Sequence, residues 1–207
     1  RQMCIRDRYK ISGGLHGVGA SVVNALSVWL EVEIRVDGGV YKQRYERGKA
    51  TAPLEKIGTC RKNDTGTTVT FLPDGEIFEK TRFKADAIKS RLHETAYLNP
   101  GLTIEFEDKR KGSEDKETFH EPDGLKAYIK DLNNGKETVC DIVYFKKKQE
   151  DIEVEVAFQF VNEFEENILG FCNNIYTQEG GTHITGFKTK FTMIINPVSY
   201  THLTRPT

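Results

Sequence analysis

The sequence shows no excess of positive charge and no long apolar run. Its 207 residues hold 30 Lys and Arg against 31 Asp and Glu, a formal net charge of −1. A broad positive surface, which tight non-specific DNA binding requires, is therefore not predicted. If DNA is a partner, another part of an assembly has to hold it. No run of about 18 apolar residues is present, so we expect no membrane span. The first residues also carry no signal-peptide pattern.

Cysteine is scarce and scattered. The four cysteines form no C-x-x-C pair and no zinc-binding spacing; they are Cys4, Cys60, Cys140 and Cys172. A disulfide framework is therefore not expected, and the pattern favours a reducing cytoplasmic compartment. Both ends of the chain also lack a continuous hydrophobic pattern. Residues 1–8 and 197–207 are either frayed termini or flanks foreign to the native protein, and the second interpretation is preferred.

The rest of the chain predicts an α+β or mixed α/β fold. Hydrophobic residues make up 37% and charged residues 29%, as in ordinary globular proteins. Asp37-Gly38-Gly39 is typical of a tight hairpin between two strands. Helical periodicity predicts helices from about residue 20, over 82–98, over 124–133 and over 183–195. Alternating or β-branched runs predict strands at 28–36, 40–46, 66–74, 102–110, 141–148, 152–162 and 167–175.

The glycine stretch YKISGGLHGVGASVVNALS, residues 9–27, carries the strongest functional signal. A P-loop requires lysine directly after its last glycine, but Ala20 follows Gly19 here. A dinucleotide-binding turn requires a third glycine where Val22 stands. What remains is a G-x-x-G-x-G loop that enters a helix, from Gly14 to Gly19. Spacing alone leaves two interpretations open: a phosphate-binding loop, and a mobile loop or close helix–strand crossing.

The full wording of this stretch resembles the ATP lid of the B subunits of bacterial type II DNA topoisomerases, which belong to the GHKL group of ATPases. TGTTVTFLPD (65–74) resembles the next ATP-site motif, and RLHETAYLNPGLTIEFEDKR (91–110) resembles the block that closes the ATPase domain. Residues 154–196 resemble the start of the transducer domain. The resemblance implies the C-terminal part of a Bergerat-type ATPase sandwich over residues 9–122, followed by part of a ribosomal S5 domain 2-like transducer over 123–196.

The resemblance also implies roles for individual residues. The backbone amides from Leu15 to Gly19 would wrap the β- and γ-phosphates of ATP, and Thr67 would form a hydrogen bond near the adenine. An ordinary β-branched strand residue is the alternative for Thr67. The expected ATP-binding set is Tyr9, Lys10, Gly13, Gly14, Leu15, His16, Gly17, Val18, Gly19, Ala20 and Thr67.

Three members of this set have competing interpretations. Lys10 either adds a point charge beside the phosphates or is a solvent-exposed surface lysine. Tyr9 would touch the sugar or base, but it lies at the junction with the suspected foreign flank. His16 has a pKa near neutrality in its ordinary state, which suits a general base. Its place in the lid instead favours packing or proximity to the phosphates.

In this family the water-activating glutamate, the Mg²⁺-binding asparagine and the adenine-reading aspartate all precede the lid. The transducer lysine that reaches the γ-phosphate lies beyond Asn196. No catalytic residue and no metal ligand is therefore assigned within this chain, although ATP and Mg²⁺ are the implied cofactors. Positioned acid–base groups contribute about 10²–10⁴ in rate, so we expect the isolated chain to hydrolyse ATP poorly. The apolar side chains of Val22, Leu26 and Trp29 should be incompletely covered.

The resemblance implies DNA, a second B subunit and an A subunit as partners, with no membrane. Within the family a gyrase-type subunit is the preferred interpretation and a topoisomerase IV subunit is the alternative. A non-catalytic nucleotide-binding or dimerisation module is a further hypothesis from another functional class.

Overall fold

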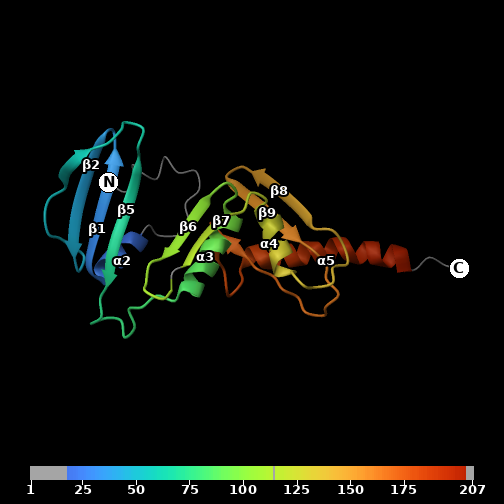
Figure 1. Cartoon of the computed structure of the whole chain (residues 1–207). Helices are drawn as coiled ribbons and strands as arrows, with labels where there is room; N and C mark the ends of the chain where they lie inside the picture. Colours follow the sequence, from blue (N-terminus) through green and yellow to red (C-terminus); the bar gives the residue numbers. More distant parts are fainter. Residues whose placement is uncertain (1–17, 114, 204–207) are drawn as a thin grey trace. The chain divides into compact units, whose positions relative to one another are not determined.

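The computed structural model describes residues 18–113 and 115–203, and it combines helices with antiparallel sheets, which confirms the α+β prediction (Figure 1). The chain divides into two compact units, with the boundary between Phe83 and Lys84. This boundary lies inside the segment predicted as the ATPase part, and the domain boundary after residue 122 stays a prediction.

The first unit is a short helix attached to an antiparallel sheet. It contains α2 (Gly19–Ala25), β1 (Ser27–Val36), β2 (Gly39–Glu46), β3 (Lys49–Ala50), β4 (Glu55–Thr59) and β5 (Gly66–Pro73). The strand order is β3-β2-β1-β5, and β4 also pairs with β2. Figure 1 shows α2 at the end of the sheet where β1 begins and β5 ends.

The predicted hairpin between β1 and β2 is confirmed. Val36 pairs with Gly39, so Asp37 and Gly38 form a two-residue turn. Their φ angles are 49° and 78°, the left-handed values that a tight hairpin of this kind requires. The register places Leu30, Val32 and Ile34 of β1 on one face of the sheet.

That apolar face is only partly covered. Leu30 is buried, whereas its neighbours on β5, Val69 and Phe71, keep 53% and 39% of their surface exposed. On α2, Val22 is 47% exposed. The prediction of incomplete covering is confirmed for Val22, while Leu26 and Trp29 are half-buried.

Within the described residues, the second unit contains three β-hairpins and three helices. Its elements are α3 (Ala85–Leu98), β6 (Thr103–Asp108), β7 (Asp115–His120), α4 (Leu125–Leu132), β8 (Val143–Gln149), β9 (Ile152–Phe158), β10 (Phe171–Cys172), β11 (Ile175–Tyr176) and α5 (Thr182–Leu203). The strands pair as the hairpins β6-β7, β8-β9 and β10-β11. Ala96 and Tyr97 of α3 and Phe119 of β7 form its buried core.

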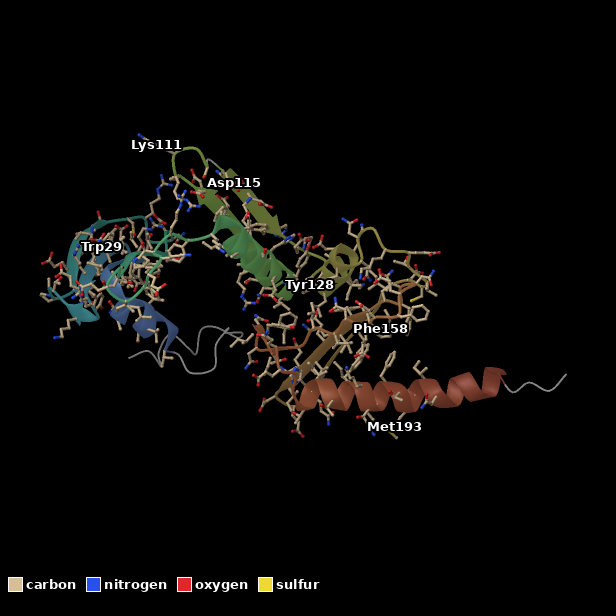
Figure 2. The ribbon with its side chains drawn as sticks, turned by 90° about the horizontal axis from the view of Figure 1, so that it is seen from below. Trp29, Lys111, Asp115, Tyr128, Phe158 and Met193 are labelled. Atoms are coloured by element: carbon tan, nitrogen blue, oxygen red, sulfur yellow. The ribbon has the colours of Figure 1, made fainter. Side chains whose placement is uncertain are left out.

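An aromatic cluster joins β9 to α5. The ring centroids of Phe158 and Phe191 lie 5.2 Å apart with nearly perpendicular planes, and Phe187 stacks on Phe191 at 5.4 Å. Figure 2 shows Phe158 between β9 and α5, with Met193 on the other side of the helix. Met193 is largely exposed. One face of α5 therefore packs on the β8-β9 hairpin.

The structure differs from the predicted elements at several places, among them β7, which begins inside the segment 111–117 predicted as a loop. The strand expected over 167–175 is only the short β10-β11 hairpin, because Asn173 and Asn174 have φ angles of 49° and 64° and reverse the chain. Strand β4 was not predicted, since all five of its residues are exposed and give no apolar alternation. Helix α5 continues past Asn196 to Leu203, although the pattern predicted its end near residue 195. The origin of the flank over 197–207 stays a prediction.

No helix within residues 18–113 and 115–203 combines the length and apolarity that crossing a membrane requires. Cys60, Cys140 and Cys172, the cysteines that the structure describes, are free thiols.

Candidate nucleotide-binding site

The beginning of α2 has the chemistry of an anion-binding helix terminus. Val18 is the N-cap, with φ −96° and ψ −8°, and its side chain forms no capping hydrogen bond. The first turn contains no acidic residue, and Val18, Gly19 and Ala20 are all exposed. The N–H groups of a first helical turn have no partner within the helix. An accessible helix start without a side-chain cap can therefore donate hydrogen bonds to a phosphate.

Gly19 lies in open space with respect to the residues that the structure describes. Apart from its chain neighbours and the helix's own backbone, none of them places a heavy atom within 4 Å of a Cβ atom built on Gly19. These residues therefore leave room for a ligand to approach this backbone closely. The arrangement fits the anionic phosphates of ATP, the ligand that the sequence predicts.

Most of the predicted lid lies outside the described residues. This applies to Tyr9, Lys10, Gly13, Gly14, Leu15, His16 and Gly17. Their proposed roles stay predictions, and only Val18, Gly19 and Ala20 of the lid have a described conformation.

Thr67 lies on β5 opposite Ile34 of β1, and it is exposed. It lies on the partly covered face of the sheet that also carries Val69 and Phe71. Ser27, where β1 begins beside α2, pairs with Pro73 at the other end of the ladder. Ser27 and Ile34 are seven residue steps apart along β1, a span of about 23 Å.

The described structure therefore places Thr67 and α2 in the same unit but toward different ends of the sheet. The roles of Thr67 and of the start of α2 stay predictions.

A partly buried polar cluster at the C-terminal end of α2 was not predicted. It contains Ser27, Arg47 and Asp74, and the last of these follows β5 in the quoted motif TGTTVTFLPD. Asp74 is only 2% exposed, and its Oδ2 lies 2.9 Å from Nε of Arg47. A hydrogen bond with Glu76, followed by the charge of Asp74, raises the pKa of Arg47 above its ordinary value. A single aspartate after a strand gave no signal of this pairing, because its partner is distant in sequence.

Among the residues that the structure describes, no group of three or more His, Cys, Asp or Glu side chains could hold a metal ion.

Comparison with known proteins agrees with the predicted family. The family model for DNA gyrase B matches residues 124–204. The DNA gyrase B subunit of Thermotoga maritima is 47% identical over 205 residues, which cover 95% of this chain and 32% of that protein. The DNA topoisomerase 4 B subunit of Streptococcus pneumoniae is 49% identical over 189 residues, covering 91% of this chain and 29% of that protein. The chain thus spans about a third of the length of these relatives.

Solved structures show the same relationship. The 43K ATPase domain of Thermus thermophilus gyrase B, solved in complex with an aminocoumarin, matches with a TM-score of 0.79 and 36% identity. The match covers 93% of this chain and 52% of that one. The topoisomerase IV ATP-binding domain of Francisella tularensis, in complex with a small-molecule inhibitor, matches with a TM-score of 0.66 and 32% identity, covering 86% and 48% of the two chains. The predicted resemblance and fold are confirmed.

Proposed function

Because the chain belongs to the family of bacterial type II DNA topoisomerase B subunits, we propose that it forms the ATPase and transducer part of such a subunit. In this role it couples ATP binding and hydrolysis to DNA strand passage and supercoiling. One observation carries the proposal: the glycine stretch enters α2 at an exposed helix start whose N-cap residue, Val18, forms no side-chain capping hydrogen bond. The similarity to two ATP-binding domains over most of the chain supports it.

In the proposed site the N–H groups from Leu15 to Gly19 donate hydrogen bonds to the β- and γ-phosphates. Aligned backbone dipoles stabilise the phosphate charge most effectively where water is partly excluded. Thr67 is exposed and has a hydroxyl group that can both donate and accept a hydrogen bond near the adenine. Mg²⁺, when bound with ATP, neutralises phosphate charge. We assign it no ligand among the described residues.

The proposed partners are DNA, a second B subunit and the A subunit that cleaves DNA, acting in the cytoplasm. This chain's formal net charge of −1 supplies no broad positive surface. DNA would therefore be held mainly by the assembled enzyme.

A topoisomerase IV subunit is the second candidate. It is supported by the 49% identity to the Streptococcus pneumoniae topoisomerase 4 subunit, against 47% for the Thermotoga maritima gyrase subunit. Pairing the protein with each type of A subunit would separate the candidates, since introduction of negative supercoils identifies the gyrase type.

The proposal is tested by a chimera in which residues 9–196 replace the aligned segment of Thermotoga maritima gyrase B. The double change Gly17→Ala/Gly19→Ala should weaken ATP binding at least about tenfold, because lost phosphate hydrogen bonds to a charged ligand are each worth more than 1 kcal/mol. Folding should be retained at Gly19, where a Cβ would lie more than 4 Å from the described residues outside the helix and its N-cap.

Gly58→Ala is the matched control, since its Cβ would make only an ordinary 3.9 Å contact with Val40. ATP affinity that is equal in the double variant, the control and the unchanged chimera would show that the lid assignment is wrong.

A further inference from the structure

Helix α2 is attached to the sheet mainly through its C-terminal end. None of its seven residues is buried, so hydrophobic packing does little to fix its position. At the end of the helix, however, the Ser27 hydroxyl is buried and donates a 2.6 Å hydrogen bond to the Val23 carbonyl. The backbone N–H of Asp74 donates to the Leu26 carbonyl at 3.1 Å. The chain that follows β5 therefore closes onto the last turn of α2.

Asp74 is the centre of this attachment. Its buried carboxylate accepts a hydrogen bond from the Glu76 backbone N–H at 2.9 Å and pairs with Nε of Arg47 at 2.9 Å. The same guanidinium reaches Glu76 through Nη2, at 2.6 Å. A buried carboxylate is stable only when paired and hydrogen-bonded, so its position is closely constrained by Arg47.

Arg47 adopts a backbone conformation that is unusual for its residue type. Its φ angle is 45°, and that of Gly48 is 83°, in the two-residue turn between β2 and β3. The turn between β1 and β2 also has two successive residues with positive φ. They are Asp37 and Gly38, an ordinary pair for such a hairpin. Asn, Asp and Gly are the residues that accept left-handed conformations readily, and arginine is not among them.

The strained turn also contacts α2 directly. The N–H of Arg47 donates to the Val28 carbonyl at 3.3 Å, and a Cβ on Gly48 would lie 3.4 Å from Cα of Ala25. The side chain and backbone of one residue thus hold both the end of α2 and the start of β1. Strain of this kind persists where the surrounding structure holds it, and it is concentrated at functional sites.

We propose that Arg47 and Asp74 are positioning residues for ATP binding. They fix the C-terminal end of α2, so that the helix that follows the glycine stretch is held in one position when ATP binds. This inference rests on the proposed function, because it takes α2 as the helix that follows the ATP lid. Neither residue is placed in contact with the nucleotide.

The first test measures hydrogen exchange in the 207-residue chain itself. Arg47→Asn removes the pair with Asp74 but introduces a residue that favours the left-handed turn. If Arg47 served only the turn, this change would leave the exchange of α2 amides the same or slower. The proposal predicts exchange at least about tenfold faster at residues 22–26, the size expected for loss of a charge-assisted hydrogen bond, with β1 amides at 30–34 unchanged.

Lys42→Gln is the matched control. It breaks the 2.8 Å ion pair between Lys42 of β2 and Glu31 of β1 without touching α2. Asp74→Asn is a second variant that preserves side-chain shape and removes the charge, and Arg47→Lys should restore part of the protection. Exchange in α2 that matches the control in both Arg47→Asn and Asp74→Asn would overturn the proposal.

The second test uses the chimera described above. Arg47→Asn should raise the ATP concentration for half-maximal hydrolysis about tenfold and leave kcat close to that of the Lys42→Gln control. If Arg47→Asn speeds amide exchange in α2 but leaves the ATP concentration for half-maximal hydrolysis unchanged, the link to ATP is overturned. If the unmodified chimera folds but does not bind ATP, the proposed function itself is wrong, which the variants alone cannot show.

Discussion

Tyr97 of α3 and Tyr128 of α4 stack with ring centroids 4.7 Å apart and ring planes only 6° from parallel. His93 stacks on the same Tyr97 ring at 4.4 Å, and its Nε2 lies 2.8 Å from Oε1 of Glu121. The amide of Asn174, in the β10-β11 turn, donates to Oδ1 of Asn99 at 2.8 Å. The last helix of the predicted ATPase segment is therefore packed on the first helix of the predicted transducer segment.

Replacing Tyr128 by alanine should destabilise the second unit by about 2 kcal/mol. The change removes the ring stacking and part of the apolar contact. Because the ring is only half-buried, the loss of stability should be smaller than for a fully buried aromatic residue. Urea unfolding followed by tyrosine fluorescence measures the change. Lys130→Ala, an exposed position on the same helix, is the control. Equal midpoints for the two variants would contradict the assigned role of the stack.

The Tyr97 hydroxyl predicts a loss of stability at alkaline pH. Burial, together with the charges of Asp131 and Glu121, raises the pKa of Tyr97 well above its ordinary value of 10. Above pH 10 the unfolded chain releases this proton while the folded chain retains it. The stabilisation is therefore complete below pH 10 and decreases as pH rises further.

Tyr97→Phe removes this dependence. Between pH 10 and pH 11 the stability of the variant should fall less steeply than that of the unchanged chain, as measured by urea unfolding at each pH. Parallel slopes for the two proteins would show that this hydroxyl does not titrate differently on folding.

Gly38→Ala should destabilise the first unit by about 1 kcal/mol. The φ angle of Gly38 is 78°, and an L-residue is strained there even though its Cβ would meet the Cys60 carbonyl oxygen at an ordinary 3.6 Å. The loss would therefore report backbone strain without a clash. Thermal unfolding of this variant beside Gly58→Ala provides the comparison, and a Gly38→Ala protein as stable as its control would contradict the turn conformation.

The partly covered face of the first unit should bind a hydrophobic dye. Val69 and Phe71 lie on one face of β5, and both are substantially exposed. Apolar patches of this kind on isolated chains cause association or dye binding. Phe71→Thr should reduce dye fluorescence, whereas Lys56→Thr on the exposed β4 should not. A chain that binds no dye and melts sharply would show that this face is covered in solution.

Sequence patterns predicted the elements whose signals are local. The Asp37-Gly38 turn and the alternation in β1 both follow from residue types a few positions apart. Strand β4 gave no such signal, because pairing with β2 stabilises a segment whose side chains all face solvent. At 167–175 the apolar composition predicted one strand, but the left-handed Asn173 and Asn174 make a turn.

For the candidate site the sequence contributed a different kind of signal. The glycine loop and Thr67 were proposed from motifs that lie within short stretches of sequence, and their roles stay predictions. The anchoring of α2 was not predicted, since Arg47 and Asp74 are separated by strands β3, β4 and β5 and meet only when the sheet forms. In the sequence, Arg47 followed by Gly48 gives no sign of an unusual turn. Its left-handed backbone is visible only in the structure.

The most direct test of the central claim is ATP-dependent DNA supercoiling by the chimera that carries residues 9–196, assembled with the Thermotoga maritima A subunit. We expect the folded chimera to supercoil relaxed plasmid only when ATP is present. Gly17→Ala/Gly19→Ala should abolish this activity and Gly58→Ala should preserve it. A folded, assembled chimera that neither binds ATP nor changes DNA topology would contradict the account.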